Sequence, residues 1–219
     1  MLKPAENDFV NFLKETLPRF PKNKVAETAA PSFCHPNFLI RWVAWQRIRR
    51  ALETIEKLSP KTILDFGSGS GVLLPFCAPK AKRVYALDIN TCLLKETQKK
   101  YRLGNVKIIK YAGGKVPLKS KTVDLVCALE VLEHLENLEQ MLLQIYRLCK
   151  PGGYLLISLP TENIFYKVGR FLAGFKGDYH KNSYRRVIKK VEDKFEPIKY
   201  STLSKFIPLY IFGLYKKED

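Results

Sequence analysis

The chain has few of the features that mark secreted, disulfide-bonded or membrane-spanning proteins. Its five cysteines are an odd number without a C-x-x-C pair, which argues against a disulfide framework or a zinc ribbon. The first residues, MLKPAENDFV, lack the continuous apolar segment of a secretory signal. No stretch reaches the roughly 18 apolar residues that a transmembrane helix needs. We therefore expect a cytoplasmic protein with reduced thiols and no transmembrane segment.

Internal repeats, low-complexity tracts and a long basic tail are also absent. The 219 residues are 46% hydrophobic, enough for the core of one α/β domain with modest additions. Acidic residues are scarce, since 21 Asp and Glu stand against 38 Lys and Arg, a formal charge of +17. This balance permits attraction to nucleic acid, to an anionic membrane surface or to an anionic substrate. A basic surface without a special role explains it as well.

The most informative stretch is Lys61 to Pro75, KTILDFGSGSGVLLP. Thr62 to Phe66 is the short apolar run that is typical of a buried parallel strand. The glycines that follow, at every second position from Gly67 to Gly71, predict a sharp turn. Unpaired backbone N–H groups at such a turn can hold a polar or anionic ligand group. Alone, the pattern is weak, because a simple tight connection has the same glycines.

An acidic residue after the next apolar run strengthens the interpretation. Arg83 to Asp88 ends in a carboxylate about 20 residues after Gly67, near the spacing at which an acid meets ribose hydroxyls in nucleotide-binding βαβ units. Further strands are expected over 106–111, 122–129, 154–159, 197–203 and 208–215. They alternate with helices over 91–101, 135–149 and 183–194, which predicts an α/β fold with a parallel sheet. Ligands in such sheets bind at the carboxyl ends of the strands.

Four segments in this order resemble a class I S-adenosylmethionine-dependent methyltransferase of the small ubiquinone-pathway type. They are LDFGSGSG, ALDIN, VDLVCALEVLEHL and LCKPGGYLLISLP, and they span roughly Lys61 to Pro160. The resemblance implies a Rossmann-like three-layer sandwich with a mostly parallel seven-stranded sheet and an antiparallel last strand. It also implies S-adenosylmethionine as cofactor. The residues that it assigns to the methionine part of that cofactor are Asp65, Gly67, Ser68, Gly69 and Gly71.

The resemblance further implies that Asp88 binds the ribose and that Ile89 packs on the adenine. Members of the family usually have an acidic residue after the third strand, which contacts the adenine amino group. That place falls at Ala112 here, within Tyr111-Ala112-Gly113-Gly114, so the chain departs from the pattern. The adenine contact is then left to the backbone at Ala112 or to a neighbouring side chain.

The stretch Glu130 to His134, EVLEH, has several interpretations. If it is helical, Glu130, Glu133 and His134 share one face and could ligate Mg²⁺, with His180 as a fourth ligand. Some ubiquinone-pathway and small-RNA 2′-O-methyltransferases use a similar pattern in this way. Many relatives carry it without metal, with Glu130 near the cofactor and His134 lining the pocket, and we favour this interpretation. His134 is also a candidate general base, as His180 is with less support.

The N-terminal part, residues 1–58, is expected to form helices that pack on the core or cover it. Asn37 is a plausible N-cap for a helix that ends near Leu58. The predicted apolar stripe of this helix leaves its arginines mainly outside and consists of Phe38, Leu39, Trp42, Val43, Trp45, Ile48, Leu52, Ile55 and Leu58. The stripe is best explained by packing on the sheet. The alternative places Trp42 or Trp45 in the roof of a substrate pocket.

Residues 59–219 are expected to form the methyltransferase core, with a lid-like insertion at about 161–182. Its segment 163–176 has phenylalanines at helical spacing and several basic residues. It predicts a substrate lid or a core helix, or else a helix that lies on an anionic membrane. The favoured acceptor is a small or lipid-like molecule. The alternatives are RNA, favoured by the charge, and a partner subunit that binds the cofactor without catalysis.

Overall fold

The computed structural model describes residues 3–21, 25, 28–161, 181–203 and 209–218. A seven-stranded sheet with the order β3-β2-β1-β4-β5-β7-β6 forms its middle layer. The strands are β1 Thr62–Phe66, β2 Arg83–Asp88, β3 Val106–Lys110, β4 Val123–Leu129, β5 Cys149–Pro160, β6 Glu196–Thr202 and β7 Tyr210–Lys216. Strands β1 to β5 pair in parallel, and β7 is antiparallel to both β5 and β6. The predicted fold class is confirmed, including the antiparallel last strand.

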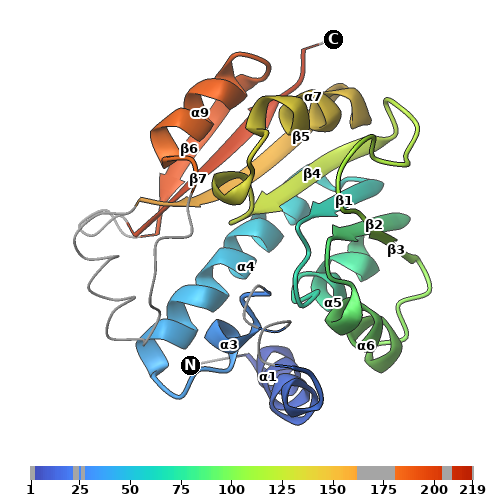
Figure 1. The fold of residues 1–219 in the computed structure, drawn as a ribbon, viewed down its shortest axis with the longest axis vertical. Coiled ribbons are helices and arrows are strands. Elements are labelled where there is room, and N and C mark those ends of the chain that lie inside the picture. Colours follow the sequence, from blue (N-terminus) through green and yellow to red (C-terminus); the bar gives the residue numbers. More distant parts are fainter. Residues whose placement is uncertain (1–2, 22–24, 26–27, 162–180, 204–208, 219) are drawn as a thin grey trace.

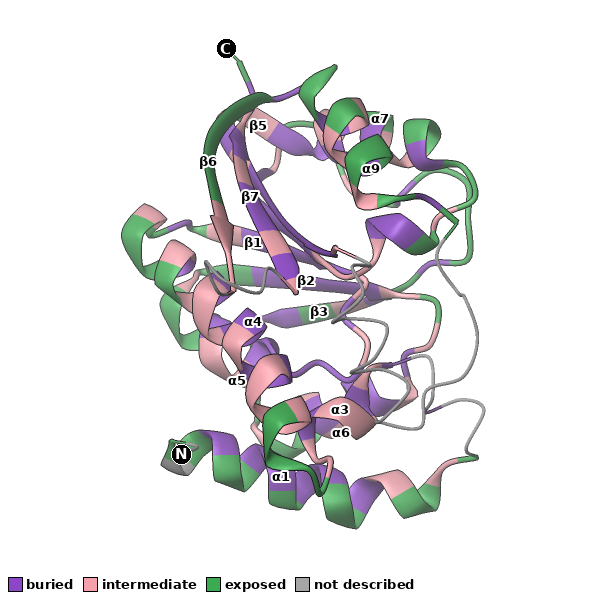
Figure 2. Ribbon diagram, turned by 90° about the vertical axis from the view of Figure 1, so that its left-hand side faces the viewer, coloured by how far each residue is buried: buried purple, intermediate pink, exposed green. Residues whose placement is uncertain are grey.

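Helices cover both faces of the sheet, as Figure 1 shows. One core contains side chains from α1, α3, α4, α5 and α6, and the other contains side chains from α7 and α9. The bounds are α1 Pro4–Thr16, α3 Ala30–Phe33, α4 Phe38–Leu58, α5 Leu74–Cys77, α6 Cys92–Lys100, α7 Leu138–Leu148 and α9 Tyr184–Glu192. Short 3-10 turns are η1 Leu17–Arg19, η2 Ala78–Lys80 and η3 Leu132–His134. In Figure 2 the edge strand β6 is largely exposed, whereas its neighbour β7 is mostly buried.

The long helix α4 begins and ends where the sequence predicts. Asn37 Oδ1 accepts a hydrogen bond from the Leu39 N–H at 2.9 Å, which satisfies one of the free donors of the first turn. Its buried face differs from the predicted stripe, because Phe38 and Leu39 are 51% and 66% exposed while Arg47 is buried. Phe38 and Leu39 are in the first turn of α4, which precedes the part of the helix that packs on the core.

Trp45 belongs to the core rather than to a pocket roof. Its ring is fully buried and meets the rings of Phe9, Phe33 and Phe76 edge-on. Its indole Nε1 donates to the Phe33 carbonyl at 3.3 Å, so the polar end is also satisfied. Trp42 is half-buried.

Three local features are not apparent from the sequence. The segment before α4 includes the short helix α3. Lys150-Pro151-Gly152-Gly153 lies within β5, where Gly152 at φ 68° accommodates a shift in register against β4. Residues 130–134 do not form one α-helical turn, since η3 begins only at Leu132.

The helix expected over 163–176, its alternative as a membrane-binding segment, and His180 lie outside the described residues. In the part of the chain that is described, no helix is both long enough and apolar enough to cross a bilayer.

Candidate functional site

The glycine-rich turn after β1 has a backbone that only glycine fits. Gly67, Gly69 and Gly71 have φ values of 73°, 54° and 73°. A Cβ on Gly67 would lie 2.5 Å from Val131 Cγ2, and one on Gly69 would lie 2.8 Å from the Thr28 carbonyl oxygen. The turn therefore packs tightly between the end of β4 and the segment before α3. The alternating glycines are required by both conformation and space.

The N–H groups of this turn are less free than the sequence predicts. Gly67 and Ser68 both donate to the Leu87 carbonyl, at 2.8 and 3.1 Å, and the Gly71 N–H donates to the Ser68 carbonyl at 2.8 Å. The Gly69 N–H donates to Asp88 Oδ2 at 2.7 Å. Four N–H groups of the turn are thus satisfied within the protein, three of them by residues at the end of β2.

Asp88, at the carboxyl end of β2, connects the glycine turn to the segment after β2 through hydrogen bonds. Its Oδ2 binds the Gly69 N–H and its Oδ1 accepts from the Asn90 N–H at 2.8 Å. The side chain of the next residue, Ile89, is 60% exposed. A carboxylate beside an exposed apolar side chain matches a ligand with polar hydroxyls next to a flat apolar group.

Asp65 lies beneath the turn and is 4% exposed. The pKa of this carboxyl is raised to about 7, mainly by burial; the hydrogen bond with Ser68 lowers the pKa and the charge of Asp88 raises it. The Ser68 hydroxyl donates to the Asp65 carbonyl oxygen at 2.7 Å. A buried carboxyl of this kind ionises readily when a cation is placed beside it.

The end of β3 confirms that an acidic residue is missing there. The Tyr111 N–H donates to the Asp88 carbonyl at 3.0 Å, so this end lies beside Asp88. Ala112 is exposed, and Gly113 and Gly114 follow with positive φ. The Tyr111 hydroxyl donates to the Gly114 carbonyl at 2.6 Å and fixes the loop.

Glu130 pairs with a residue of α4. Its φ of 55° lies in the left-handed region, and its carboxylate forms an ion pair with Arg47 of α4. Glu133 is 1% exposed, whereas the His134 side chain is 43% exposed, with Nε2 lying 4.0 Å from Glu133 Oε1. The shared helical face on which the metal interpretation depended is absent. No group of three metal-ligating side chains occurs in the residues that the structure describes.

The partner of Glu130, Arg47, was not expected from the sequence to be buried. It is 5% exposed, and its guanidinium lies 5.5 Å from the centre of the Phe33 ring and 5.2 Å from that of Tyr210. The sequence contained one indication of this burial: Ala44 and Ala51, both buried, lie three residues before and four residues after Arg47. They share its helix face and leave room for a long side chain.

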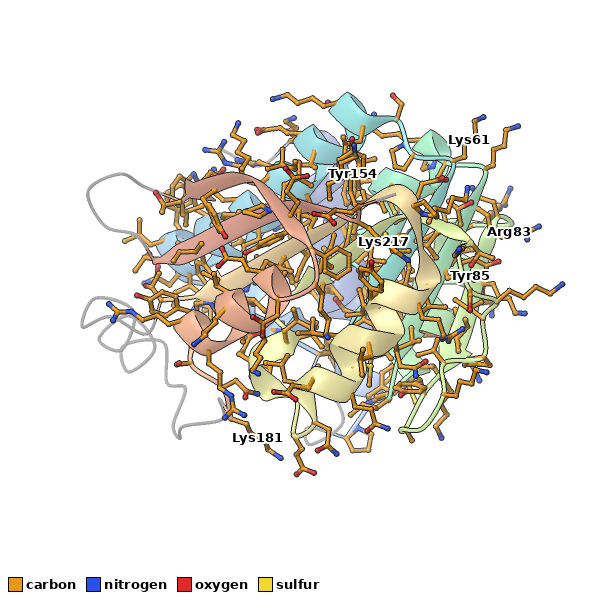
Figure 3. All side chains as sticks on the ribbon, turned by 90° about the horizontal axis from the view of Figure 1, so that it is seen from above. Lys61, Arg83, Tyr85, Tyr154, Lys181 and Lys217 are labelled. Atoms are coloured by element: carbon orange, nitrogen blue, oxygen red, sulfur yellow. The ribbon has the colours of Figure 1, made fainter. Side chains whose placement is uncertain are left out.

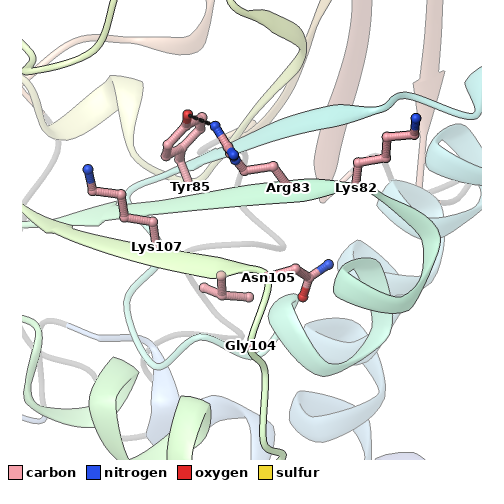
Figure 4. A pocket seen from close by; sticks show the side chains of 7 residues that line it. Lys82, Arg83, Tyr85, Gly104, Asn105 and Lys107 are labelled. Carbon is pink, nitrogen blue, oxygen red and sulfur yellow. Dashed lines mark hydrogen bonds between the residues drawn. The ribbon is translucent and has the colours of Figure 1, made fainter.

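A separate basic hollow lies at the opposite ends of the strands. It has a volume of about 420 Å³, and its lining contains Lys82, Arg83 and Lys107 but no acidic residue. Figure 4 shows these three side chains pointing to the same side of β2 and β3. In Figure 3, Lys181 lies far from Lys61 and Arg83, so the positive charge is spread over the molecule.

Comparison with known proteins finds similarity to methyltransferases. Residues 64–157 match the family model for the methyltransferase domain. The chain is 36% identical over 103 residues to a ubiquinone biosynthesis O-methyltransferase of Rickettsia canadensis, covering 46% of this chain and 43% of that protein. It is 26% identical over 127 residues to a malonyl-[acyl-carrier protein] O-methyltransferase of Serratia marcescens, covering 56% and 47%. It thus spans about half the length of these curated relatives.

Among solved structures, the fold resembles the N-methyltransferase NodS from Bradyrhizobium japonicum in complex with S-adenosyl-L-homocysteine. The TM-score is 0.65 at 15% identity, covering 90% of this chain and 98% of that one. The segment that matches the methyltransferase-domain family model, residues 64–157, contains the glycine turn, Asp88 and Glu130, while Arg47 lies outside it. Residues 64–157 are therefore similar to the methyltransferase domain of known proteins.

Proposed function

We propose that the chain is a methyltransferase that transfers the methyl group of S-adenosylmethionine to a small or lipid-like acceptor. The observation that carries the proposal is the closure of the glycine turn on Asp88, with Asp65 buried below it and Ile89 exposed beside it. When bound, the cofactor supplies an electrophilic sulfonium methyl group. The relatives named for ubiquinone biosynthesis and malonyl-[acyl-carrier protein] support an acceptor other than nucleic acid.

In this proposal, the cofactor residues keep the roles that the family resemblance implies. The methionine part is held at Asp65, Gly67, Ser68, Gly69 and Gly71. Asp88 binds the ribose, Ile89 packs on the adenine, and the backbone at Ala112 borders its amino group. Glu130 stands next to the cofactor at the end of β4.

The protein has little covalent chemistry to perform, because the sulfonium methyl is already electrophilic. Its task is to hold the acceptor in line, to exclude water and in some cases to accept a proton. His134 is the candidate base among the described residues, since its half-exposed ring is accessible to an acceptor. We propose that residues 1–58 cover this site and that 59–219 form the core. The five unpaired cysteines support a cytoplasmic location.

RNA is the second candidate acceptor, and the basic hollow favours it. Three cations without an acidic neighbour in the lining suit a phosphate backbone. The hollow lies at the amino ends of β2 and β3, away from the glycine turn. RNA bound there would have to extend around the molecule to reach the methyl group.

Calorimetric titration with S-adenosylmethionine tests the proposal. Wild-type protein is expected to bind, and Asp88→Ala is expected to bind at least tenfold more weakly, because it loses the charged acceptor. The control is Asp193→Ala, at the end of α9, which should bind like wild type. Absence of wild-type binding would overturn the proposal. Salt-sensitive binding of a single-stranded RNA that weakens in Lys82→Ala and Lys107→Ala would favour the second candidate.

A further inference from the structure

Within the part of the chain that is described, the ion pair of Arg47 and Glu130 leaves two hydrogen-bonding atoms without partners. Arg47 Nη1 faces Glu130 Oε2, and Arg47 Nε donates to the Ala44 carbonyl at 3.4 Å. Glu130 Oε1 is buried and has no hydrogen-bond partner. No described residue accepts from Arg47 Nη2. Among the described residues, the pair therefore leaves one buried charged acceptor and one charged donor unsatisfied.

Glu130 Oε1 is buried, and a buried polar atom without a partner destabilises the folded state by about 1–3 kcal/mol, and by more when it is charged. The Arg47 guanidinium has little freedom to seek another partner, because it lies between the Phe33 and Tyr210 rings. Such unpaired groups in a rigid setting are typical of ligand sites.

The pair lies at the edge of the sheet where the cofactor site is proposed. Val131, the next residue after Glu130, is the one that leaves no space for a Cβ on Gly67. The Glu130 N–H donates to the Ser158 carbonyl at the end of β5, at 3.0 Å. Tyr210 begins β7 and pairs with Pro160, the last residue of β5. Arg47 and Glu130 thus border the glycine turn on the side away from Asp88.

We propose that Arg47 and Glu130 form the acceptor-recognition subsite of the methyltransferase, and that it takes a planar acceptor with an N–H or O–H donor next to a neutral oxygen. The donor of the acceptor binds Glu130 Oε1, and its oxygen accepts from Arg47 Nη2. The Phe33 and Tyr210 rings provide apolar surface beside the planar group. This inference rests on the proposed function and adds the class of acceptor to it.

Charge distinguishes this class of acceptor from carboxylates, phosphates and ammonium groups. A carboxylate or phosphate would accept from Arg47 but would place a second negative charge against Glu130 Oε1. An ammonium group would bind Glu130 but would face the guanidinium. A neutral group with both functions satisfies the two atoms without repulsion.

Three single-ring probes separate these classes. Benzamide has an N–H donor next to an oxygen, acetophenone has the same shape with a methyl group in place of the NH₂, and benzoate has two anionic oxygens. Their affinities are measured by ligand-observed NMR on the full chain with saturating S-adenosylhomocysteine. We expect benzamide to bind the wild type at least tenfold more tightly than acetophenone or benzoate.

The variants test which atoms carry the preference. Arg47→Met should lower the affinity for benzamide about tenfold, while Arg50→Met, exposed on the same helix, should leave it unchanged. Glu130→Gln removes the repulsion and should invert the order of benzoate and benzamide. A purely structural role of the pair would not produce this inversion.

Calorimetry with S-adenosylhomocysteine on every variant keeps the two proposals apart. If the wild type binds no S-adenosylhomocysteine, both proposals fall. If it binds S-adenosylhomocysteine but shows no saturable binding of benzamide, or no preference for it, the acceptor subsite alone is overturned. Retained S-adenosylhomocysteine binding by Arg47→Met shows that a lost probe affinity is not caused by unfolding.

Discussion

Asp88 Oδ2 accepts a hydrogen bond from the backbone N–H of Gly69 at 2.7 Å, across the gap between the ends of β1 and β2. The bond needs a backbone that approaches β2 closely, which the glycines allow. It also orients the carboxylate, whose other oxygen is held by the Asn90 N–H. The shape of the glycine turn and the position of the acid are therefore one structural unit.

The first prediction concerns the space around Gly67. Gly67→Ala places a Cβ 2.5 Å from Val131 Cγ2 at a φ of 73°, so we expect the free energy of unfolding to fall by about 2–4 kcal/mol. Urea denaturation measures this loss. Gly104→Ala is the control, because its Cβ meets nothing within 4 Å, and it should change stability by less than about 0.5 kcal/mol.

A second substitution divides the loss at Gly67 into its two causes. Val131→Ala removes the methyl groups that clash, so in the Gly67→Ala background it should recover part of the stability. The part of the lost stability that is not recovered measures the backbone strain of an alanine at positive φ. Full additivity of the two single changes would show that the predicted contact does not exist.

The elements that could be predicted from the sequence are those whose signals are local. The bounds of β1 and β2 follow from short apolar runs next to glycine or aspartate, and the start of α4 follows from the Asn37 cap. The proximity of Gly67 and Asp88 was also predictable, since parallel strands end at the same edge. The Asp88 contact itself depends on the fold of the turn.

The parts that could not be predicted depend on distant partners. Arg47 is buried because Glu130, 83 positions later, is brought opposite to it by the sheet. No local pattern distinguishes it from the other arginines of α4 except its two alanine neighbours. The helical alternative for 130–134 was wrong because Glu130 has a left-handed φ of 55°, which is rare for a residue other than glycine and which the sequence does not signal.

The second prediction tests how α6 supports the glycine turn. Thr97 is fully buried, and its Oγ1 donates to the Ser70 carbonyl at 2.8 Å. Thr97→Val keeps the shape but leaves that carbonyl without its donor, so stability should fall by about 1–3 kcal/mol, with weaker binding of S-adenosylmethionine. Denaturation and calorimetry measure the two effects.

Thr54→Val is the matched control for Thr97. The Thr54 hydroxyl donates to the Arg50 carbonyl within its own helix at 3.1 Å, and the side chain is only half-buried. We expect a change below about 0.5 kcal/mol and unaltered cofactor binding. Equal losses at both positions would contradict a special role of the bond to Ser70.

The third prediction concerns a buried lysine near the end of the chain. Lys217, labelled in Figure 3, is 6% exposed, and its Nζ donates to the carbonyls of Tyr146 and Cys149 at 2.8 and 3.0 Å. The same Nζ lies 4.0 Å from the centre of the Tyr146 ring. The lysine therefore joins the end of β7 to the last turn of α7, where a cation is favourable.

Lys217→Met should therefore lower the free energy of unfolding by about 2–3 kcal/mol, because two buried carbonyls lose a charged donor. Lys216→Met, next to it and less buried, should have an effect below about 0.5 kcal/mol. Both values come from urea denaturation at neutral pH. A loss shared equally by the two lysines would point to general charge effects instead.

The fourth prediction uses the unusual pKa of Asp65. Burial raises that pKa from 3.8 to about 7, so the folded state keeps a proton that the unfolded state releases. The stability that this proton provides is complete below about pH 4 and is lost as the pH rises through about 7. Wild type should therefore lose on the order of 4 kcal/mol relative to Asp65→Asn over this range. Parallel pH profiles of the two proteins in urea denaturation would contradict the shift.

The same carboxyl should couple cofactor binding to proton release. If the amino group of S-adenosylmethionine lies near Asp65, its charge favours the carboxylate, so binding at about pH 6.5 expels the buried proton. The binding enthalpy should then differ between phosphate and Tris buffers, because the two buffers take up a proton with different enthalpies. Asp65→Asn has no proton to release and should remove this part of the difference. If the variant keeps the full buffer dependence, the proton comes from another group and Asp65 does not face the cofactor.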